Sequence, residues 1–289
     1  LLIKILRYKM IVWLASYPKS GNTFLRSLLV GYFFSKDGEF NFDLLRMIDQ
    51  FPNSKLFNEL GINLDDRNEI EKNYVEAQKI INKKKNSIQF WKTHNAFCKL
   101  QGKYNFTDLE NTTGAIYIVR DPRNVVSSYA NHYQKSLEES VIDLNTNLEI
   151  RQSHSDRLPV FIGSWNFHYK SWKQLKLIDK YLLIKYEDLL FDTEKNFLKI
   201  LEFLNKISDT QFKIDISKIK RVIDNTSFDK IKDLEDKFGF VEAKKDNNGK
   251  RINFFNLGPM NKWENKLNPK IRKKIEDTFG EEMKEIGYL

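Results

Sequence analysis

The chain has 289 residues, of which 41% are hydrophobic and 30% charged, and its formal net charge is +9. This length is sufficient for one α/β domain with a full core, and the composition is that of an ordinary globular chain. The positive charge indicates an anionic partner, which leaves nucleic acid, an acidic membrane face and a phosphorylated small molecule open.

Cysteine and histidine usage argues against disulfide and metal chemistry. Cys98 is the single cysteine, so no disulfide can form within the chain; we interpret it as a small buried apolar residue and predict a cytoplasmic location. No apolar run approaches the roughly 20 residues that a membrane span needs. We assign residues 10–289 to one domain and treat residues 1–9 as an extension of unknown role. We predict no metal site, because ligand spacing is absent from the four histidines, His94, His132, His154 and His168.

Four short apolar runs are predicted to be buried strands, and helix-length amphipathic segments lie between them. None of the runs alternates apolar and polar residues, which is typical of a parallel sheet covered on both faces, so we predict one open α/β sheet. The strands are predicted at Met10–Ser16, Ile88–Lys92, Ala115–Val119 and Tyr181–Lys185. The helices are predicted at Thr23–Phe34, Arg123–Tyr133, Val160–Ile178, the segment TEKNFLKILEFLN capped by Asp192, and Pro269–Ile286.

Two polar segments are predicted to lack regular structure. Leu137–Leu158 carries few strong apolar positions and is expected to be a mobile excursion over the sheet, and Lys244–Lys250, KKDNNGK, is expected to be a loop. The stretch Phe42–Phe51, FDLLRMIDQF, fits either a lid or a core helix, and we favour the core helix.

The stretch Tyr17–Thr23, YPKSGNT, links the first predicted strand to the first predicted helix. A helix N-terminus presents unpaired N–H groups and partial positive charge, Gly21 allows close approach of an anion, and Lys19 adds a full charge. The lysine precedes the glycine, so the stretch differs from the nucleotide loop GxxxxGK[ST]. We predict an anion-binding loop; the alternative is an ordinary turn in which Ser20 or Asn22 caps the helix.

A second stretch, Phe90–Phe97, reads FWKTHNAF and places His94 at the carboxyl end of a predicted strand. Open α/β sheets bind ligands at this edge, and the near-neutral pKa of histidine suits a general base. The alternative for a lone histidine is a structural role.

A third stretch, Ile116–Tyr129, reads IYIVRDPRNVVSSY. Arg120 ends a strand and Ser128 lies about two turns into the next helix, an arrangement that suits a second phosphate. The alternative is a surface ion pair between Arg120 and Asp121 or Asp188.

Together these stretches resemble the sulfotransferase family that uses 3′-phosphoadenylyl sulfate (PAPS). YPKSGNTF resembles the family's 5′-phosphosulfate loop, WKTH its catalytic segment and VRDPRNVVSSY its 3′-phosphate stretch. GSWNFHYKSW, IKYEDL, NTSFDKIK and the C-terminal WENKLNPKIRKKIEDTFGEEMKEIGY follow in family order. The resemblance implies a single P-loop-NTPase-like domain with a central parallel sheet, and a metal-independent sulfotransferase with PAPS as co-substrate and adenosine 3′,5′-bisphosphate (PAP) as product.

The resemblance also implies a role for each matching position. His94 would take the proton of the acceptor hydroxyl, Lys19 would contact the bridging oxygen of the leaving group, and Lys92 would help to neutralise the transferring group. Arg120 and Ser128 would hold the 3′-phosphate. The 5′-phosphate would be surrounded by Ser20, Gly21, Asn22 and Thr23, and the adenine would be contacted by Phe24, Tyr186, Thr226, Ser227 and Phe228.

The chain departs from the family pattern most strongly at Phe254–Gly258, which reads FFNLG where the family usually has F-x-R-K-G. Asparagine and leucine take the places of the basic pair that grips the 3′-phosphate, although Gly258 is retained. We expect Arg251, or Lys250 beside it, to reach the 3′-phosphate from the preceding loop. Without such a cation the 3′-phosphate would be bound more weakly. Asn22 and Phe24 replace the commoner threonine and tryptophan and keep a donor and an aromatic face.

Three other functions stay open at this stage. A small-molecule kinase is disfavoured, because GK[ST] is missing and Asp121 is the only candidate for holding Mg²⁺. Nucleic-acid binding is suggested by the charge and the aromatic residues, but no binding motif is present, so we expect no nucleic-acid partner. A non-catalytic relative is compatible with FFNLG. The acceptor is expected to be a small-molecule, lipid or carbohydrate hydroxyl selected by Phe34–Lys83 and Leu137–Leu158, and no oligomeric state is predicted.

Overall fold

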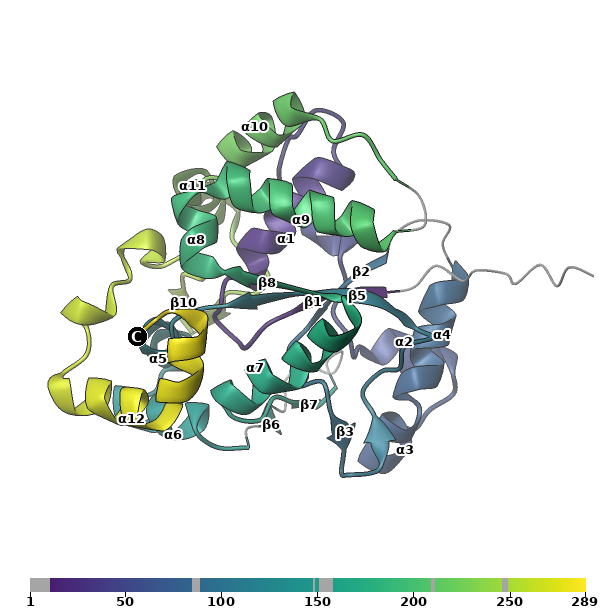
Figure 1. Cartoon of the computed structure of the whole chain (residues 1–289), viewed down its shortest axis with the longest axis horizontal. Coiled ribbons are helices and arrows are strands. Elements are labelled where there is room, and N and C mark those ends of the chain that lie inside the picture. Colours follow the sequence, from purple (N-terminus) through teal and green to yellow (C-terminus); the bar gives the residue numbers. More distant parts are fainter. Residues whose placement is uncertain (1–10, 85–88, 148, 151–157, 209–210, 246–248) are drawn as a thin grey trace, which may run out of the picture.

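The computed structural model describes residues 11–84, 89–147, 149–150, 158–208, 211–245 and 249–289. Its centre is a sheet of four parallel strands in the order β2-β1-β5-β8 (Figure 1). The predicted open parallel sheet is therefore confirmed, while Met10 and Ile88, which begin two of the predicted strands, lie outside the described residues. The strands are β1 (Ile11–Ala15), β2 (Gln89–Thr93), β5 (Thr112–Val119) and β8 (Tyr181–Lys185).

Both faces of the sheet are covered, which explains why its strands are apolar without alternation. In β1, Trp13 and Ala15 belong to one buried cluster, and Val12 and Leu14 belong to another on the opposite face. The Val12 face is covered by α1 (Asn22–Phe33), α8 (Tyr186–Phe191), α9 (Thr193–Ile207), α10 (Ile216–Asn225) and α11 (Phe228–Phe238) (Figure 1).

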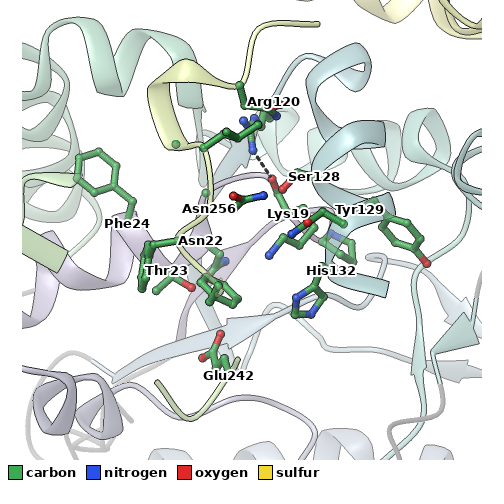
Figure 2. A pocket seen from close by; sticks show the side chains of 18 of the residues that line it. Lys19, Asn22, Thr23, Phe24, Arg120, Ser128, Tyr129, His132, Glu242 and Asn256 are labelled. Carbon is green, nitrogen blue, oxygen red and sulfur yellow. Dashed lines mark hydrogen bonds between the residues drawn. The ribbon is translucent and has the colours of Figure 1, made fainter. Parts of the chain in front are cut away.

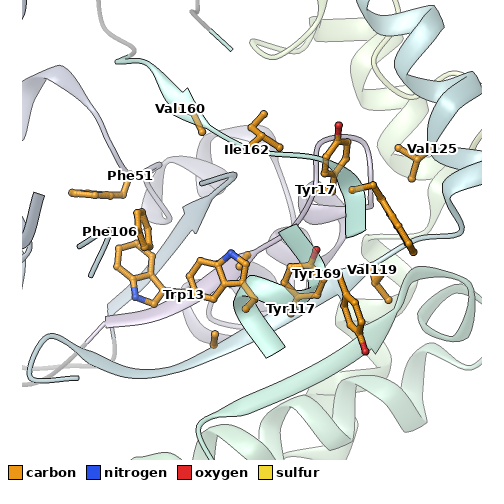
Figure 3. Packing of buried hydrophobic residues seen from close by; sticks show 14 of the residues in the cluster. Trp13, Tyr17, Phe51, Phe106, Tyr117, Val119, Val125, Val160, Ile162 and Tyr169 are labelled. Atoms are coloured by element: carbon orange, nitrogen blue, oxygen red, sulfur yellow. The ribbon is translucent and has the colours of Figure 1, made fainter. Parts of the chain in front are cut away.

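The Trp13 face carries the larger aromatic core. Trp13 lies beside Phe51 and Phe106 (Figure 3). The ring centroid of Trp13 is 5.6 Å from that of Phe51 and 5.1 Å from that of Phe106. This face is covered by α4 (Tyr74–Lys84), α5 (Pro122–Tyr133), α7 (Trp165–Lys173) and α12 (Pro269–Ile286). Burial of such large apolar side chains is the main source of stability of a domain of this size.

Shorter elements complete the described part of the chain. No helix in it is long and apolar enough to cross a membrane. The short helices are η1 (Phe42–Met47), α2 (Ser54–Glu59), α3 (Arg67–Lys72), α6 (Leu137–Leu144), η2 (Gln174–Ile178), η3 (Gly258–Met260) and η4 (Trp263–Asn265). The short strands form three antiparallel pairs, β3 (Lys99–Leu100) with β4 (Tyr104–Asn105), β6 (Glu149–Ile150) with β7 (Val160–Phe161), and β9 (Lys244–Lys245) with β10 (Arg251–Ile252).

The predicted helix over Val160–Ile178 is wrong at its start. Residues 160–161 form β7, and the helix begins only at Trp165, capped by the Ser164 side chain. Gly163 breaks the chain direction with φ of +72°, and a Cβ there would lie 2.5 Å from the Phe167 ring. Glycine at this position therefore separates strand from helix.

The predicted loop over Leu137–Leu158 is wrong for its first part, which forms α6. Ser136 and Glu139 close a capping box at its start, and Val141 and Leu144 are buried in the core. Residues 148 and 151–157 of this segment lie outside the described residues.

Two other local predictions are partly right. The strands β9 and β10 flank the predicted loop over Lys244–Lys250, of which residues 246–248 are not described. FDLLRMIDQF contains a 3₁₀ helix that buries Leu45 while Asp43, Arg46 and Met47 are exposed, so it is only partly core. Cys98 is half-buried against the core rather than fully buried, and burial raises the pKa of its thiol to about 11.

Candidate active site

The carboxyl ends of three neighbouring strands open into one cavity of about 1070 Å³. The register brings them level, because Ala15 at the end of β1 pairs with Thr93 of β2 and with Tyr117 of β5. The loop after β1, the end of β2 and the end of β5 therefore meet at one edge of the sheet. The predicted site residues that line the cavity are Lys19, Gly21, Asn22, Thr23, Phe24, Lys92, His94, Arg120, Ser128, Tyr186, Phe228 and Gly258.

The loop between β1 and α1 has the backbone of an anion-binding turn. Lys19 and Gly21 have φ of +66° and +96°, and Gly21 precedes the first helical residue without any side-chain cap. The alternative in which Ser20 or Asn22 caps the helix is therefore wrong; the Asn22 amide donates instead to a carbonyl of β1 at 2.9 Å. A Cβ on Gly21 would lie 2.2 Å from the Tyr186 ring, so glycine is required for this packing.

Arg120 connects the loop to the end of β5. Its Nη1 donates to the Lys19 carbonyl at 3.1 Å (Figure 2). Its guanidinium lies 4.6 Å from the centre of the Tyr186 ring. Arg120 is buried, and Asp121 is paired with Arg123 at 2.7 Å, so the alternative of a surface ion pair for Arg120 is wrong. The guanidinium is thus held beside the loop, and the residue lines the cavity.

Lys19 is the cation at the centre of the loop. Its Nζ lies 3.9 Å from the centre of the Phe254 ring, and burial lowers the pKa of this amine to about 7. The positive charges of Arg120 and Lys92 lower the pKa further, whereas the Glu242 carboxylate raises it. An anion in the cavity would restore the charged form, because it offsets the repulsion between these cations.

His94 lines the cavity as a neutral imidazole. Its Nδ1 lies 2.7 Å from the Ser16 carbonyl oxygen, which only accepts, so the hydrogen is assigned to Nδ1 and the lone pair to Nε2. Burial lowers the pKa of His94 to about 3, and the charge of Lys92 contributes. Nε2 is therefore available as a proton acceptor throughout the neutral pH range.

Helix α7 holds the segment that carries His94. His168 Nε2 lies 3.2 Å from the His94 carbonyl oxygen, and its Nδ1 lies 2.8 Å from the Tyr117 hydroxyl. Trp172 Nε1 donates to the Asn95 carbonyl at 2.9 Å. Because these partners are buried, the backbone around His94 is fixed from behind and its ring faces the cavity.

Four predicted site residues do not line the cavity. Thr226 is buried and its hydroxyl donates to a carbonyl of α10 at 2.8 Å, while Ser227 precedes α11 without a capping hydrogen bond. Arg251 donates to the Glu235 carbonyl at 2.7 Å and therefore does not reach in as expected. Ser20 lies in the loop with its hydroxyl buried.

The stretch FFNLG does line the cavity, with Asn256 and Leu257 where the family has its basic pair. Sequence reasoning missed several other residues of the lining, among them His132 and Glu242. His132 lies one helical turn after Ser128, a spacing that was visible in the sequence, and burial together with the charge of Lys19 lowers its pKa to about 2. Glu242 enters from the link between α11 and β9, for which the sequence contains no local signal.

The fold and the site define an α/β protein with a cavity at its strand ends that is lined by cationic side chains. The family model of the sulfotransferase domain matches residues 10–287, so the chain belongs to the sulfotransferase family. This membership confirms the predicted family and the enzyme class, and it sets the kinase alternative aside. Among the described residues, no group of three His, Cys, Asp or Glu side chains could hold a metal ion.

Individual relatives show the same likeness. The chain is 24% identical to mouse sulfotransferase 1E1 over 278 residues, which cover 94% of this chain and 83% of that protein. It is 28% identical to rat sulfotransferase 2A2 over 170 residues, 58% of this chain and 55% of the relative.

Solved structures share the fold. The crystal structure of mouse sulfotransferase SULT7A1 complexed with PAP has a TM-score of 0.60 at 20% identity, covering 95% of this chain and 84% of that one. Retinol dehydratase in a complex with retinol and PAP has a TM-score of 0.57 at 18% identity, covering 94% and 81%. The predicted fold class is therefore confirmed.

Proposed function

We propose that this chain transfers the sulfuryl group of PAPS to a hydroxyl of a small-molecule, lipid or carbohydrate acceptor. Besides family membership, one observation supports the proposal: Arg120, which lines the cavity, and Ser20, which lies in the loop beside it, each bury a polar atom, Nε and Oγ, that has no hydrogen-bond partner within the described chain. Buried polar groups are normally satisfied, and leaving one unpaired is unfavourable. A ligand with phosphate oxygens would supply the missing acceptors.

The residues around the loop fit the phosphosulfate end of PAPS. Lys19 and the backbone N–H groups at the start of α1 would hold the phosphate and the bridging oxygen on which negative charge develops. Arg120 and Ser128 would hold the 3′-phosphate, with the Asn256 amide as a neutral donor in place of a cation. Tyr186 and Phe228 would contact the adenine.

The reaction would proceed by in-line transfer. The sulfur–oxygen bond to the bridging oxygen breaks, its electron pair stays on the departing PAP, and a new sulfur–oxygen bond forms to the acceptor. The acceptor proton passes to His94 Nε2, and Lys19 stabilises the leaving oxygen. Because Nδ1 of His94 donates to Ser16, the imidazolium formed would keep this hydrogen bond.

The low pKa of His94 makes it a weak base in the free protein. The negative charge of the donor, placed between His94 and the neighbouring cations, would raise this pKa toward neutrality. Efficient proton transfer calls for a pKa near the working pH, so the base would become effective only when the donor is bound.

The test is transfer of ³⁵S from labelled PAPS to a panel of phenolic, steroidal, lipid and carbohydrate alcohols without added metal. The proposal predicts a labelled product with at least one class and loss of label transfer in His94→Gln. Release of PAP at equal rates in wild type and His94→Gln would contradict the assigned base. That residues 10–289 act as one domain, and that the protein works in the cytoplasm, stay predictions.

A further inference from the structure

A carboxylate of the chain itself occupies one end of the cationic cavity. Glu242 Oε1 accepts from Arg26 Nη2 at 2.5 Å, and Glu242 Oε2 lies 3.3 Å from Lys92 Nζ. The two cationic side chains are only 5% and 7% exposed, and that of Glu242 is 14% exposed. Two buried cations therefore hold one anion that belongs to a surface link.

The two cations lie on the elements that carry the proposed chemistry. Arg26 lies one turn after Thr23 in α1, and its Nη2 is also 3.3 Å from the Thr23 hydroxyl. Lys92 precedes His94 by two positions at the end of β2. Lys92 and Thr23 line the cavity, and Arg26 lies behind them, where it meets the cavity through the Glu242 carboxylate. The phosphosulfate end of the donor would lie on the cavity side of this group.

Arg26 retains binding capacity even with Glu242 in place. Its Nε is buried and has no hydrogen-bond partner within the described chain. A carboxylate offers two oxygens, whereas a tetrahedral oxyanion offers three and matches the planar guanidinium equally well. A sulfuryl or phosphate group in this space could therefore satisfy a donor that Glu242 leaves unpaired.

The segment that carries Glu242 is short and superficial. It links α11 to β9, and the neighbouring Val241 is 79% exposed. A change in this link would withdraw the carboxylate without moving the sheet, because the cations themselves are fixed in α1 and β2. Figure 2 shows Glu242 entering the cavity below Thr23, opposite the side on which Arg120 and Ser128 lie.

We propose that Arg26 and Lys92 form a clamp for a tetrahedral oxyanion at the phosphosulfate end of the donor, and that Glu242 occupies this clamp until the donor displaces it. Arg26 is thereby a donor-binding residue, and Glu242 is an internal competitor. The inference rests on the proposed function, because it takes PAPS as the ligand. If Glu242 instead had a structural role and maintained the shape of the cavity, its replacement would weaken binding of PAPS.

Glu242→Gln separates these two roles, because the amide keeps the shape and removes the charge. Titration calorimetry would measure the affinities of PAP and PAPS for wild type, Glu242→Gln and the matched control Glu281→Gln, which changes the same charge on the exposed side of α12. The clamp predicts binding of PAPS tighter by about tenfold in Glu242→Gln, and no change in Glu281→Gln. A larger gain for PAPS than for PAP assigns the clamp to the sulfuryl group, and equal gains assign it to the 5′-phosphate. Unchanged or weaker binding of both ligands would overturn the proposal.

A second variant tests Arg26 directly. Adding Arg26→Gln to Glu242→Gln should abolish the gain in PAPS affinity, whereas adding Arg26→Lys should keep part of that gain. Thermal denaturation would verify that each variant is folded. Inorganic sulfate provides a readout that does not depend on the nucleotide, since it should raise the melting temperature of Glu242→Gln more than that of wild type. Failure of wild type to bind PAP or PAPS would refute the proposed function, whereas donor binding without a gain in Glu242→Gln would refute only the clamp.

Discussion

Binding of PAP above pH 7 should be coupled to uptake of a proton by Lys19. Burial lowers the pKa of this amine to about 7, Arg120 and Lys92 contribute, and Glu242 opposes. About half of the free protein therefore carries a neutral Lys19 at pH 7, and about nine tenths at pH 8. A phosphate group beside the amine favours the ammonium form, so the complex takes up the proton that the free protein lacks.

The size of the effect follows from linkage. If bound PAP raises the pKa of Lys19 to about 10 or higher, binding takes up about 0.5 proton at pH 7 and about 0.9 proton at pH 8. The affinity should then fall with rising pH above 7, approaching about tenfold per pH unit. The sign follows because the ligand-bound state binds more protons than the free state, so raising the pH favours the free state. Above pH 7 the phosphates of PAP, with a second pKa near 6, contribute little to this slope.

Calorimetric titrations at pH 8 in two buffers of different ionisation enthalpy, neither of them an oxyanion, would measure the proton number. Lys19→Arg is the control, because arginine stays charged over this range and should show neither proton uptake nor the pH dependence. A proton number near zero in the wild-type protein, with an affinity constant from pH 7 to pH 9, would refute the account of Lys19.

Three further predictions concern catalysis, the loop and the 3′-phosphate. His94→Gln should lower kcat by about 10²–10⁴ while the Kd of PAP, measured by calorimetry, stays unchanged. Gly21→Ala should destabilise the protein by about 1–3 kcal/mol and abolish PAP binding. The left-handed backbone would be strained by alanine, and the new Cβ would lie 2.2 Å from the Tyr186 ring. Thermal denaturation measures the loss of stability, and calorimetry measures the loss of PAP binding. The double variant Asn256→Arg with Leu257→Lys should bind PAP about tenfold or more tightly, with AMP unaffected and a steeper dependence on salt.

Each of these three predictions can be contradicted by a specific result. A Kd for PAP that rises in parallel with the loss of kcat would show that His94 supports binding instead of proton transfer. Gly61→Ala is the control for the loop, since Gly61 has φ of +69° but nothing within 4 Å of an added Cβ; equal effects on PAP binding at both glycines would exclude the clash with Tyr186. An equal gain in affinity for AMP and PAP in the double variant would show that the new cations do not contact the 3′-phosphate.

Most of the sheet could be predicted from the sequence, because strands buried on both faces are continuous apolar runs. The break at Gly163 was missed, since the apolar residues on either side of it continue a helix-like pattern. Helix α6 was missed because LEESVIDL is short and half polar, and of its four apolar residues only Val141 and Leu144 become fully buried when α6 packs against α5 and α12. Tertiary contacts, which the local sequence does not contain, decide both cases.

The centre of the site was predictable for a geometric reason. Parallel strands end at one edge, so residues that follow three strands had to meet, and Lys19, His94 and Arg120 do so. The position of Arg251 could not be predicted, because it depends on a carbonyl of α11 that captures its guanidinium. Glu242 likewise follows from how the link after α11 folds back over the cavity, which no motif records.

Whether the cavity binds a 3′-phosphorylated donor is tested most directly by the affinity of the protein for PAP compared with AMP and with ATP–Mg²⁺. At a concentration of 100 times its Kd, a ligand that binds only the folded state adds about 2.7 kcal/mol to stability, which a thermal shift detects readily. PAP should stabilise the protein well beyond AMP and ATP–Mg²⁺. Equal stabilisation by AMP and PAP, or a preference for ATP–Mg²⁺, would contradict the assignment of the cavity to a 3′-phosphorylated sulfuryl donor.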